Sequence, residues 1–166
     1  VMRIAVTSDI HDNIWNLERA LSDINARAID ALLFLGDFCA PFTLKQIGDG
    51  FAGPIHAVFG NNDGDPFLLS TIAAGFDHVG LYPQLAELEL GGRFVALNHY
   101  PEIARRLAQS GAYDAVFSGH DHTRNIERVG ETLWANPGEI MGRFGDASYG
   151  IYDTGADSFE HVELGG

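Results

Sequence analysis

The chain has 166 residues, of which 46% are hydrophobic and 20% charged, which is enough apolar material for one folded domain spanning residues 1–166. Ten Lys and Arg residues against 23 Asp and Glu residues give a formal net charge of -13, so duplex nucleic acid is excluded as a natural partner. The single cysteine, Cys39, excludes an intrachain disulfide and a cysteine-based zinc site.

Five short apolar runs, each followed at once by a polar cluster, form the strongest pattern and predict strands buried on both faces. Amphipathic spacing from Ile14 to Ala28 predicts a helix between the first two runs, and weaker patterns predict helices over Pro66 to Ala74 and Pro101 to Leu107. Phe38 to Gly53 is expected to be a loop. The five runs are Arg3 to Thr7, Ala31 to Leu35, Ile55 to Phe59, Phe94 to Leu97 and Ala115 to Phe117.

The rest of the chain predicts antiparallel pairing. Gly91-Gly92 separates two alternating runs, Leu85 to Leu90 and Arg93 to Asn98, as in a hairpin. Four further strands are expected near the end of the chain, at Asn125 to Val129, Thr132 to Ala135, Tyr149 to Asp153 and Phe159 to Leu164. The fold class is therefore α/β, with two packed mixed β-sheets flanked by helices.

Polar clusters stand at the ends of the five runs, where the connecting loops of open α/β sheets converge on ligands. An extended spacing of two residues would place Asp9 and His11 on one side, and likewise His120 and His122. The clusters are Asp9-Ile10-His11, Gly36-Asp37, Gly60-Asn61-Asn62-Asp63, Asn98-His99 and Gly119-His120-Asp121-His122.

Carboxylate, amide and imidazole groups without thiolates suit borderline divalent cations. The set is too large for one metal that also keeps a position open for water, so we expect a site for two metal ions. Manganese is expected first, and iron, nickel and zinc accept the same ligands.

The chain resembles the calcineurin-like metallophosphoesterases, in particular their minimal phosphodiesterase branch, which includes Vps29. The resemblance lies in five motifs that occur in the same order, namely D-x-H, GD, GN, a histidine after a strand, and GHxH. The resemblance runs from Asp9 to Asn136-Pro137-Gly138. It implies an α-β-β-α sandwich and a metal-dependent phosphodiesterase that hydrolyses a small phosphate ester by attack of a metal-bridging hydroxide.

The resemblance also implies a role for each motif residue. Asp9, His11 and His122 would hold one metal, while Asn61, His99 and His120 would hold the other. Asp37 would bridge the two. Asp37, Asn61 and Asn62 are thereby the catalytic candidates.

Asn62 stands where larger relatives carry a histidine. An amide can donate a hydrogen bond to a phosphoryl oxygen but cannot protonate a leaving group. Arg143 is a second candidate for binding the phosphate. Glu139 replaces a small hydroxyl residue after the Asn136-Pro137-Gly138 loop and would disfavour highly anionic substrates, while Asp63 and Asp146 are candidates to orient ligating imidazoles.

Two other functions stay open. A Vps29-like protein-binding scaffold would share the fold, and a phosphomonoesterase or nucleotidase would share the site. No run approaches the roughly 18 apolar residues of a membrane span, so no membrane partner is expected. One cysteine and no evident leader segment favour a cytoplasmic location. The oligomeric state cannot be derived from the sequence.

Overall fold

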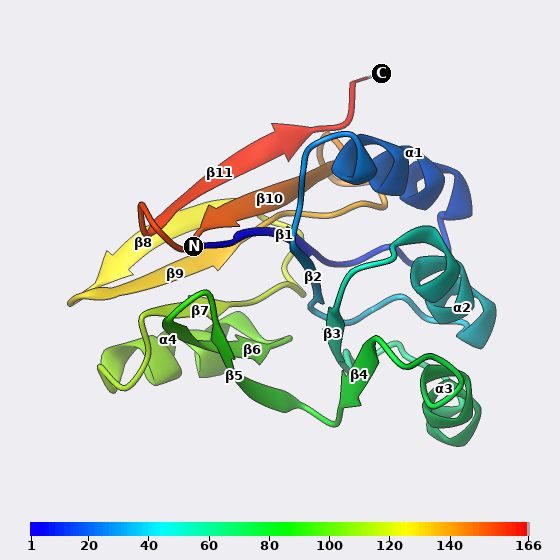
Figure 1. The fold of residues 1–166 in the computed structure, drawn as a ribbon, viewed down its shortest axis with the longest axis horizontal. Coiled ribbons are helices and arrows are strands. Elements are labelled where there is room, and N and C mark those ends of the chain that lie inside the picture. Colours follow the sequence, from blue (N-terminus) through cyan, green and yellow to red (C-terminus); the bar gives the residue numbers. More distant parts are fainter. Residues whose placement is uncertain (166) are drawn as a thin grey trace.

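A computed structural model describes residues 1–165 and contains two β-sheets packed against each other (Figure 1). The first has the order β11-β10-β1-β2-β3-β4 and the second β5-β6-β7-β9-β8. The strands of the first sheet are β11 (Ser158–Glu163), β10 (Ser148–Asp153), β1 (Arg3–Thr7), β2 (Ala31–Phe34), β3 (Ile55–Val58) and β4 (Val79–Tyr82). Those of the second are β5 (Leu85–Leu90), β6 (Arg93–Asn98), β7 (Ala115–Phe117), β9 (Thr132–Asn136) and β8 (Asn125–Val129).

Alternation along the strands builds the layers. In β1, Ile4 and Val6 point into the apolar core between the sheets, where they join Leu97 and Phe117 of the second sheet. Ala5 points the other way, into the core beneath the first three helices. These helices are α1 (Ile14–Asn25), α2 (Pro41–Gly50) and α3 (Pro66–Ala73), and α4 (Pro101–Gln109) covers the second sheet. The predicted α/β architecture of two mixed sheets flanked by helices is confirmed.

Two sequence predictions about elements were wrong, and one strand was not predicted. The stretch from Phe38 to Gly53 contains α2, which lacks a clear apolar stripe because two of its four buried residues are Thr43 and Gly48. The short strand β4 was missed because it is only half-buried and contains Gly80. Helix α1 ends at Asn25, and Ala28 beyond it has a left-handed φ of 48°.

Parallel pairing decides where the loops meet. Strands β1, β2 and β3 run parallel as neighbours in one sheet, and β6 and β7 do so in the other. The carboxyl ends of both sets therefore present their polar clusters to a common region. None of the helices formed by residues 1–165 is long and apolar enough to cross a membrane.

Candidate metal centre

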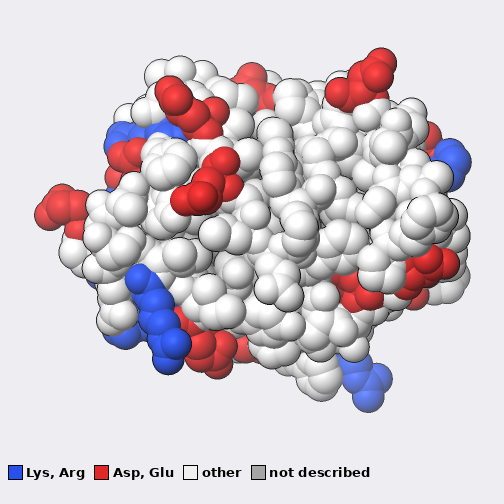
Figure 2. All heavy atoms as spheres, turned by 90° about the horizontal axis from the view of Figure 1, so that it is seen from below, with Lys and Arg blue, Asp and Glu red and all other residues white. Residues whose placement is uncertain are grey.

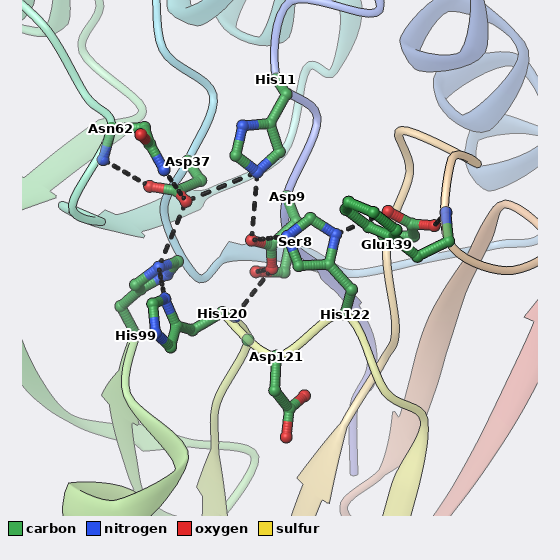
Figure 3. A network of polar contacts seen from close by, with 12 residues as sticks. Ser8, Asp9, His11, Asp37, Asn62, His99, His120, Asp121, His122 and Glu139 are labelled. Carbon is green, nitrogen blue, oxygen red and sulfur yellow. Dashed lines mark hydrogen bonds and ion pairs between the residues drawn. The ribbon is translucent and has the colours of Figure 1, made fainter.

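The strand-end clusters meet at the edge shared by the two sheets (Figure 3). Asp9 and His11 follow β1, Asp37 follows β2 and Asn61 follows β3, while His99 follows β6 and the loop with His120 and His122 follows β7. All seven predicted ligand side chains lie in this one region. They form two groups with the membership that the resemblance implied.

The first group consists of Asp9, His11 and His122. Asp9 Oδ1 lies 3.5 Å from Nε2 of both histidines. The other oxygen, Oδ2, accepts hydrogen bonds from Ser8 Oγ at 2.5 Å and from the His120 backbone N–H at 2.9 Å. Because Oδ2 is occupied, Oδ1 is the oxygen that faces the two imidazoles.

The second group consists of Asp37, His99 and His120, joined by the exposed side chain of Asn61. Asn61 Oδ1 lies 3.0 Å from His99 Nε2 and 2.9 Å from His120 Nδ1. The two imidazole nitrogens are 3.2 Å apart. Four donor atoms of the kind that divalent cations bind therefore face one another.

Asp37 stands between the groups. Its Oδ2 lies 3.5 Å from His11 Nε2 in the first group and 3.4 Å from His99 Nε2 in the second. The same oxygen accepts a hydrogen bond from Asn62 Nδ2, and Oδ1 accepts one from the Asn62 backbone N–H, both at 2.8 Å. One buried carboxylate oxygen thus lies close to an imidazole of each group.

Hydrogen bonds at the far nitrogens fix two of the imidazoles. His99 Nδ1 lies 2.6 Å from the Leu35 carbonyl oxygen, which can only accept a hydrogen bond. The proton of a neutral His99 is therefore on Nδ1, and the lone pair of Nε2 faces the site. His122 Nδ1 lies 2.6 Å from Glu139 Oε2, which imposes the same tautomer. His11 Nδ1 faces Cys39 Sγ at 3.6 Å.

The charges of the site reinforce one another. The Asp9 carboxylate, followed by the Cys39 thiol, raises the pKa of His11 to about 10 against the opposing effect of burial. Burial alone would raise the pKa of Asp37, but His99 and the two Asn62 donors hold it well below its usual range. Asp37 therefore stays ionised at neutral pH, as a metal ligand requires.

Two buried atoms of the first group have no hydrogen-bond partner, namely Asp9 Oδ1 and His11 Nε2. Orphaned polar atoms in a protein interior are costly unless a ligand or ion satisfies them. Both belong to the donor types of divalent metal sites and face each other at 3.5 Å. The residues present therefore fit a metal ion, and with Asp37 as the shared member they fit two.

The backbone at the site is strained. Asp9, His11, Asp37, His120 and His122 all have positive φ, between 45° and 73°. Non-glycine residues adopt this conformation only where surrounding contacts impose it, and such residues cluster at functional sites. The extended spacing assumed for Asp9 with His11 and for His120 with His122 was wrong, and His120 and His122 point into different groups.

Close approach of the loops depends on Gly60. A Cβ atom there would lie 2.6 Å from the Asp37 backbone nitrogen and 2.9 Å from its carboxyl carbon. Only a residue without a side chain leaves the Asp37 carboxylate in place. The glycine of the GN motif thus leaves room for the carboxylate of Asp37, a predicted metal ligand.

Several secondary assignments need correction. Asp63 accepts hydrogen bonds from the backbone N–H groups of Asp37, Cys39 and Gly60, and Asp146 is exposed, so neither is seen to orient an imidazole. Glu139 does so, although the sequence suggested only that its charge would repel anions. The one sign of this role in the sequence was that Glu139 directly follows Asn136-Pro137-Gly138, where the family resemblance predicts a small residue.

The two predicted substrate-binding side chains differ in their surroundings. Asn62 donates to Asp37, a contact that the sequence did not suggest. Arg143 is exposed, with its guanidinium carbon 5.7 Å from the centre of the Phe144 ring. Phe144 in turn packs edge-on against His122, with ring centres 5.2 Å apart. Arg143 is thus two contacts away from the first group.

A cavity of about 360 Å³ adjoins the second group. Its lining includes Gly60, which precedes Asn61, and Tyr100, which follows His99. The Tyr100 ring packs edge-on against both His99 and His120, at 5.2 and 5.1 Å between ring centres. The rest of the lining is mostly apolar, namely Phe59, Asp63, Pro66, Pro83 and Gln84.

Two facing mixed sheets with carboxylate, amide and imidazole donors at their common edge define a metallophosphoesterase-like protein. Residues 2–157 match the family model for the calcineurin-like phosphoesterase superfamily domain, and the chain belongs to this family.

Known relatives agree with this placement. The chain is 29% identical to phosphodiesterase MJ0936 of Methanocaldococcus jannaschii, over 98% of this chain and 99% of that protein. A solved structure of an archaeal phosphodiesterase superposes with a TM-score of 0.90 at 28% identity, covering 98% of this chain and 99% of that one. A zinc complex of Vps29 from Entamoeba histolytica shares the fold, with a TM-score of 0.69 at 18% identity and coverage of 99% and 100%.

Proposed function

We propose that this protein, as one domain over residues 1–166, is a metal-dependent phosphodiesterase with two divalent ions, manganese expected first. The observation that carries the proposal is the position of Asp37 Oδ2, which lies within 3.5 Å of an imidazole nitrogen in each group. The full-length similarity to a phosphodiesterase of Methanocaldococcus jannaschii supports the reaction class.

The residues divide the work. Asp9, His11 and His122 would hold one ion, Asn61, His99 and His120 the other, and Asp37 both. Ions bound there would supply activated water and neutralise the charge of the phosphoryl group. The Leu35 carbonyl fixes the His99 ring so that its Nε2 lone pair would be available to an ion in the second group.

Other side chains serve the substrate. The Asn62 side-chain amide donates a hydrogen bond to Asp37 Oδ2, and because the side chain is exposed, it can also donate to a phosphoryl oxygen. Arg143 is the proposed cationic contact for the phosphate. The cavity beside Tyr100 offers room for one ester group of a diester.

A small ester fits the charge of the protein better than duplex nucleic acid. On the face shown in Figure 2, Lys and Arg side chains stand apart near the edges and form no continuous basic stripe. A cytoplasmic location stays a prediction from the cysteine usage. The scaffold alternative is disfavoured because His11, His99, His120 and His122 are all present in the two groups, which a scaffold would not need.

The test combines metal analysis with an assay of bis(4-nitrophenyl) phosphate across Mn, Fe, Ni and Zn. We expect two ions per chain, metal-dependent turnover, and loss of at least 100-fold in Asp37→Asn and His120→Ala. Asp121→Asn is the matched control, because Asp121 lies between His120 and His122 but turns away from the site to Asn136 and Thr123 (Figure 3). Equal, slow turnover by the wild type, Asp37→Asn and His120→Ala would instead support a scaffold.

A further inference from the structure

We propose that Glu139 is a positioning residue for the first metal group, holding His122 as an Nε2 ligand. This inference rests on the proposed function and extends it to a residue at which this chain departs from the family motif. Glu139 follows β9 on the Asn136-Pro137-Gly138 loop and is 1% exposed. A carboxylate so deeply buried requires partners for all its charge.

Every partner of Glu139 is a hydrogen-bond donor. Oε2 lies 2.6 Å from His122 Nδ1, and Oε1 accepts the backbone N–H groups of Phe144 at 2.6 Å and Gly145 at 2.8 Å. An ionised carboxylate is an acceptor only, so the proton of a neutral His122 must reside on Nδ1. Nε2 then carries the lone pair and faces Asp9 Oδ1 at 3.5 Å.

The loop that carries Glu139 is joined to the loop that carries Asp9. The backbone N–H of Ile140 donates to the Ser8 carbonyl at 3.1 Å, and that of Met141 donates to the Asp9 carbonyl at 3.0 Å. On the helix side, Asn16 Nδ2 donates to the Ile140 carbonyl at 3.0 Å. These hydrogen bonds tie the loop of Glu139 to the loop of Asp9, and they therefore help to set the position of His122 relative to Asp9.

Two neighbouring rings also confine the His122 ring. His11 stacks on it with ring centres 5.1 Å apart and planes 20° from parallel. Phe144, whose backbone N–H is held by Glu139 Oε1, packs edge-on against the same ring. Without the carboxylate, no acceptor would keep the His122 proton on Nδ1. The backbone N–H groups of Phe144 and Gly145 would also lose their acceptor.

A glutamine cannot replace this group in full. Whichever way its amide is turned, the NH₂ would face either the His122 N–H or the two backbone N–H groups. Glu139→Gln thus keeps the size of the side chain and removes one side of the contact. Glu139→Ser removes both sides, while Asp157→Asn is a control for general destabilisation, because Asp157 accepts from Tyr152 and Arg128 and belongs to neither metal group.

The experiment titrates the metal-free full chain with zinc and measures stoichiometry and affinity by equilibrium dialysis with elemental analysis. We expect the wild type to bind two ions and both Glu139 variants to bind one of the two about 10- to 100-fold more weakly. Asp157→Asn should match the wild type. Circular dichroism establishes that each variant is folded.

A second measurement is independent of any variant's folding. Imidazole ¹⁵N spectra of the zinc-loaded wild type should show the His122 proton on Nδ1 and zinc on Nε2. Zinc on Nδ1, or unchanged affinity for both ions in both Glu139 variants, overturns the positioning role and leaves the proposed function standing. A wild type that binds no ion overturns both.

Discussion

Gly119 lies so close to Asp9 that a Cβ atom at position 119 would stand 2.6 Å from Asp9 Oδ2, and it would collide with the Ser8 hydroxyl as well. The glycine therefore gives the carboxylate the space in which Ser8 and His120 fix its Oδ2. The orientation of the Asp9 carboxylate in the first metal group therefore depends on the absence of a side chain at Gly119, which follows β7.

Gly119→Ala should displace Asp9 and cost about 1–3 kcal/mol of unfolding free energy, because the Ser8 and Asp9 side chains that the methyl group would meet are fully buried. Urea unfolding of the metal-free protein measures the loss, and zinc titration should show weaker binding. Gly64→Ala is the matched control, since a Cβ there meets nothing within 4 Å and φ is ordinary. Equal stability of the two variants would show that the Gly119 contact does not constrain Asp9.

Stability at low pH should depend on Asp157. Partial burial would raise the pKa of its carboxyl, but hydrogen bonds from Tyr152 and Arg128 outweigh this and lower it below the ordinary value of 3.8. A carboxyl with a depressed folded-state pKa stabilises the fold above its unfolded-state pKa, and this stabilisation is lost as the pH falls through the folded-state pKa.

We therefore expect Asp157→Asn to lower the unfolding free energy by about 1–2 kcal/mol at pH 7, with the difference from wild type shrinking as the pH falls through the lowered folded-state pKa of Asp157. Urea unfolding between pH 7 and pH 2.5 measures it. Tyr152→Phe, which removes one donor, should show a smaller effect with the same pH dependence. A difference that stays constant across this range would mean that the carboxylate charge is irrelevant.

The local sequence predicted the two sheets because near-continuous apolar runs are specific to buried strands. It predicted the polar clusters because they directly follow those strands. Only the family resemblance predicted that His120 and His122 belong to different groups. The two-residue spacing wrongly predicted that both side chains lie on the same side of the chain. Tertiary contacts decide it: the Gly119 N–H donates to the His99 carbonyl and the His120 N–H to Asp9 Oδ2, while His120 and His122 have left-handed rather than extended backbones.

Other features left no signal in the chain. The acceptor that fixes His99 is the backbone carbonyl of Leu35, which any residue would supply. Glu139 was visible as a departure from the motif, but its burial depends on the loop's pairing with Ser8 and Asp9. Binding of ions by the two groups stays a prediction.

Metal removal should lower thermal stability. An ion at 100 times its Kd stabilises the folded state by about 2.7 kcal/mol, which in a domain of this size corresponds to roughly 5–10 °C. We expect a shift of this size for each ion that chelator-treated wild type binds on addition of manganese, a smaller total shift in His122→Ala, and the full wild-type shift in Asp121→Asn. Differential scanning calorimetry measures it. A full shift in His122→Ala would exclude His122 as a ligand.

The cavity beside the second group should bind an aromatic ester group. Removing the Tyr100 ring takes away about 1.5 kcal/mol of apolar contact, so Tyr100→Ala should raise KM for bis(4-nitrophenyl) phosphate roughly tenfold. Tyr100→Phe keeps the ring and should keep KM. Zinc stoichiometry checks that His99 and His120, which the ring touches, still bind. An unchanged KM in Tyr100→Ala would place the aromatic group elsewhere.

The leaving group should decide the rate, because an amide stands where a proton donor would be needed. Asn62 is exposed and donates to Asp37, and it has no proton to give to an alkoxide. Wild type should therefore hydrolyse an aryl phosphodiester faster than an alkyl phosphomonoester with the same metal. Asn62→His should narrow that ratio at least tenfold by adding a general acid, whereas Asn62→Ala, which also loses the contact with Asp37, should lower both rates without narrowing it. Steady-state kinetics with both substrates measures the ratio, and equal narrowing in the two variants would show that the contact with Asp37, rather than proton donation, controls the preference.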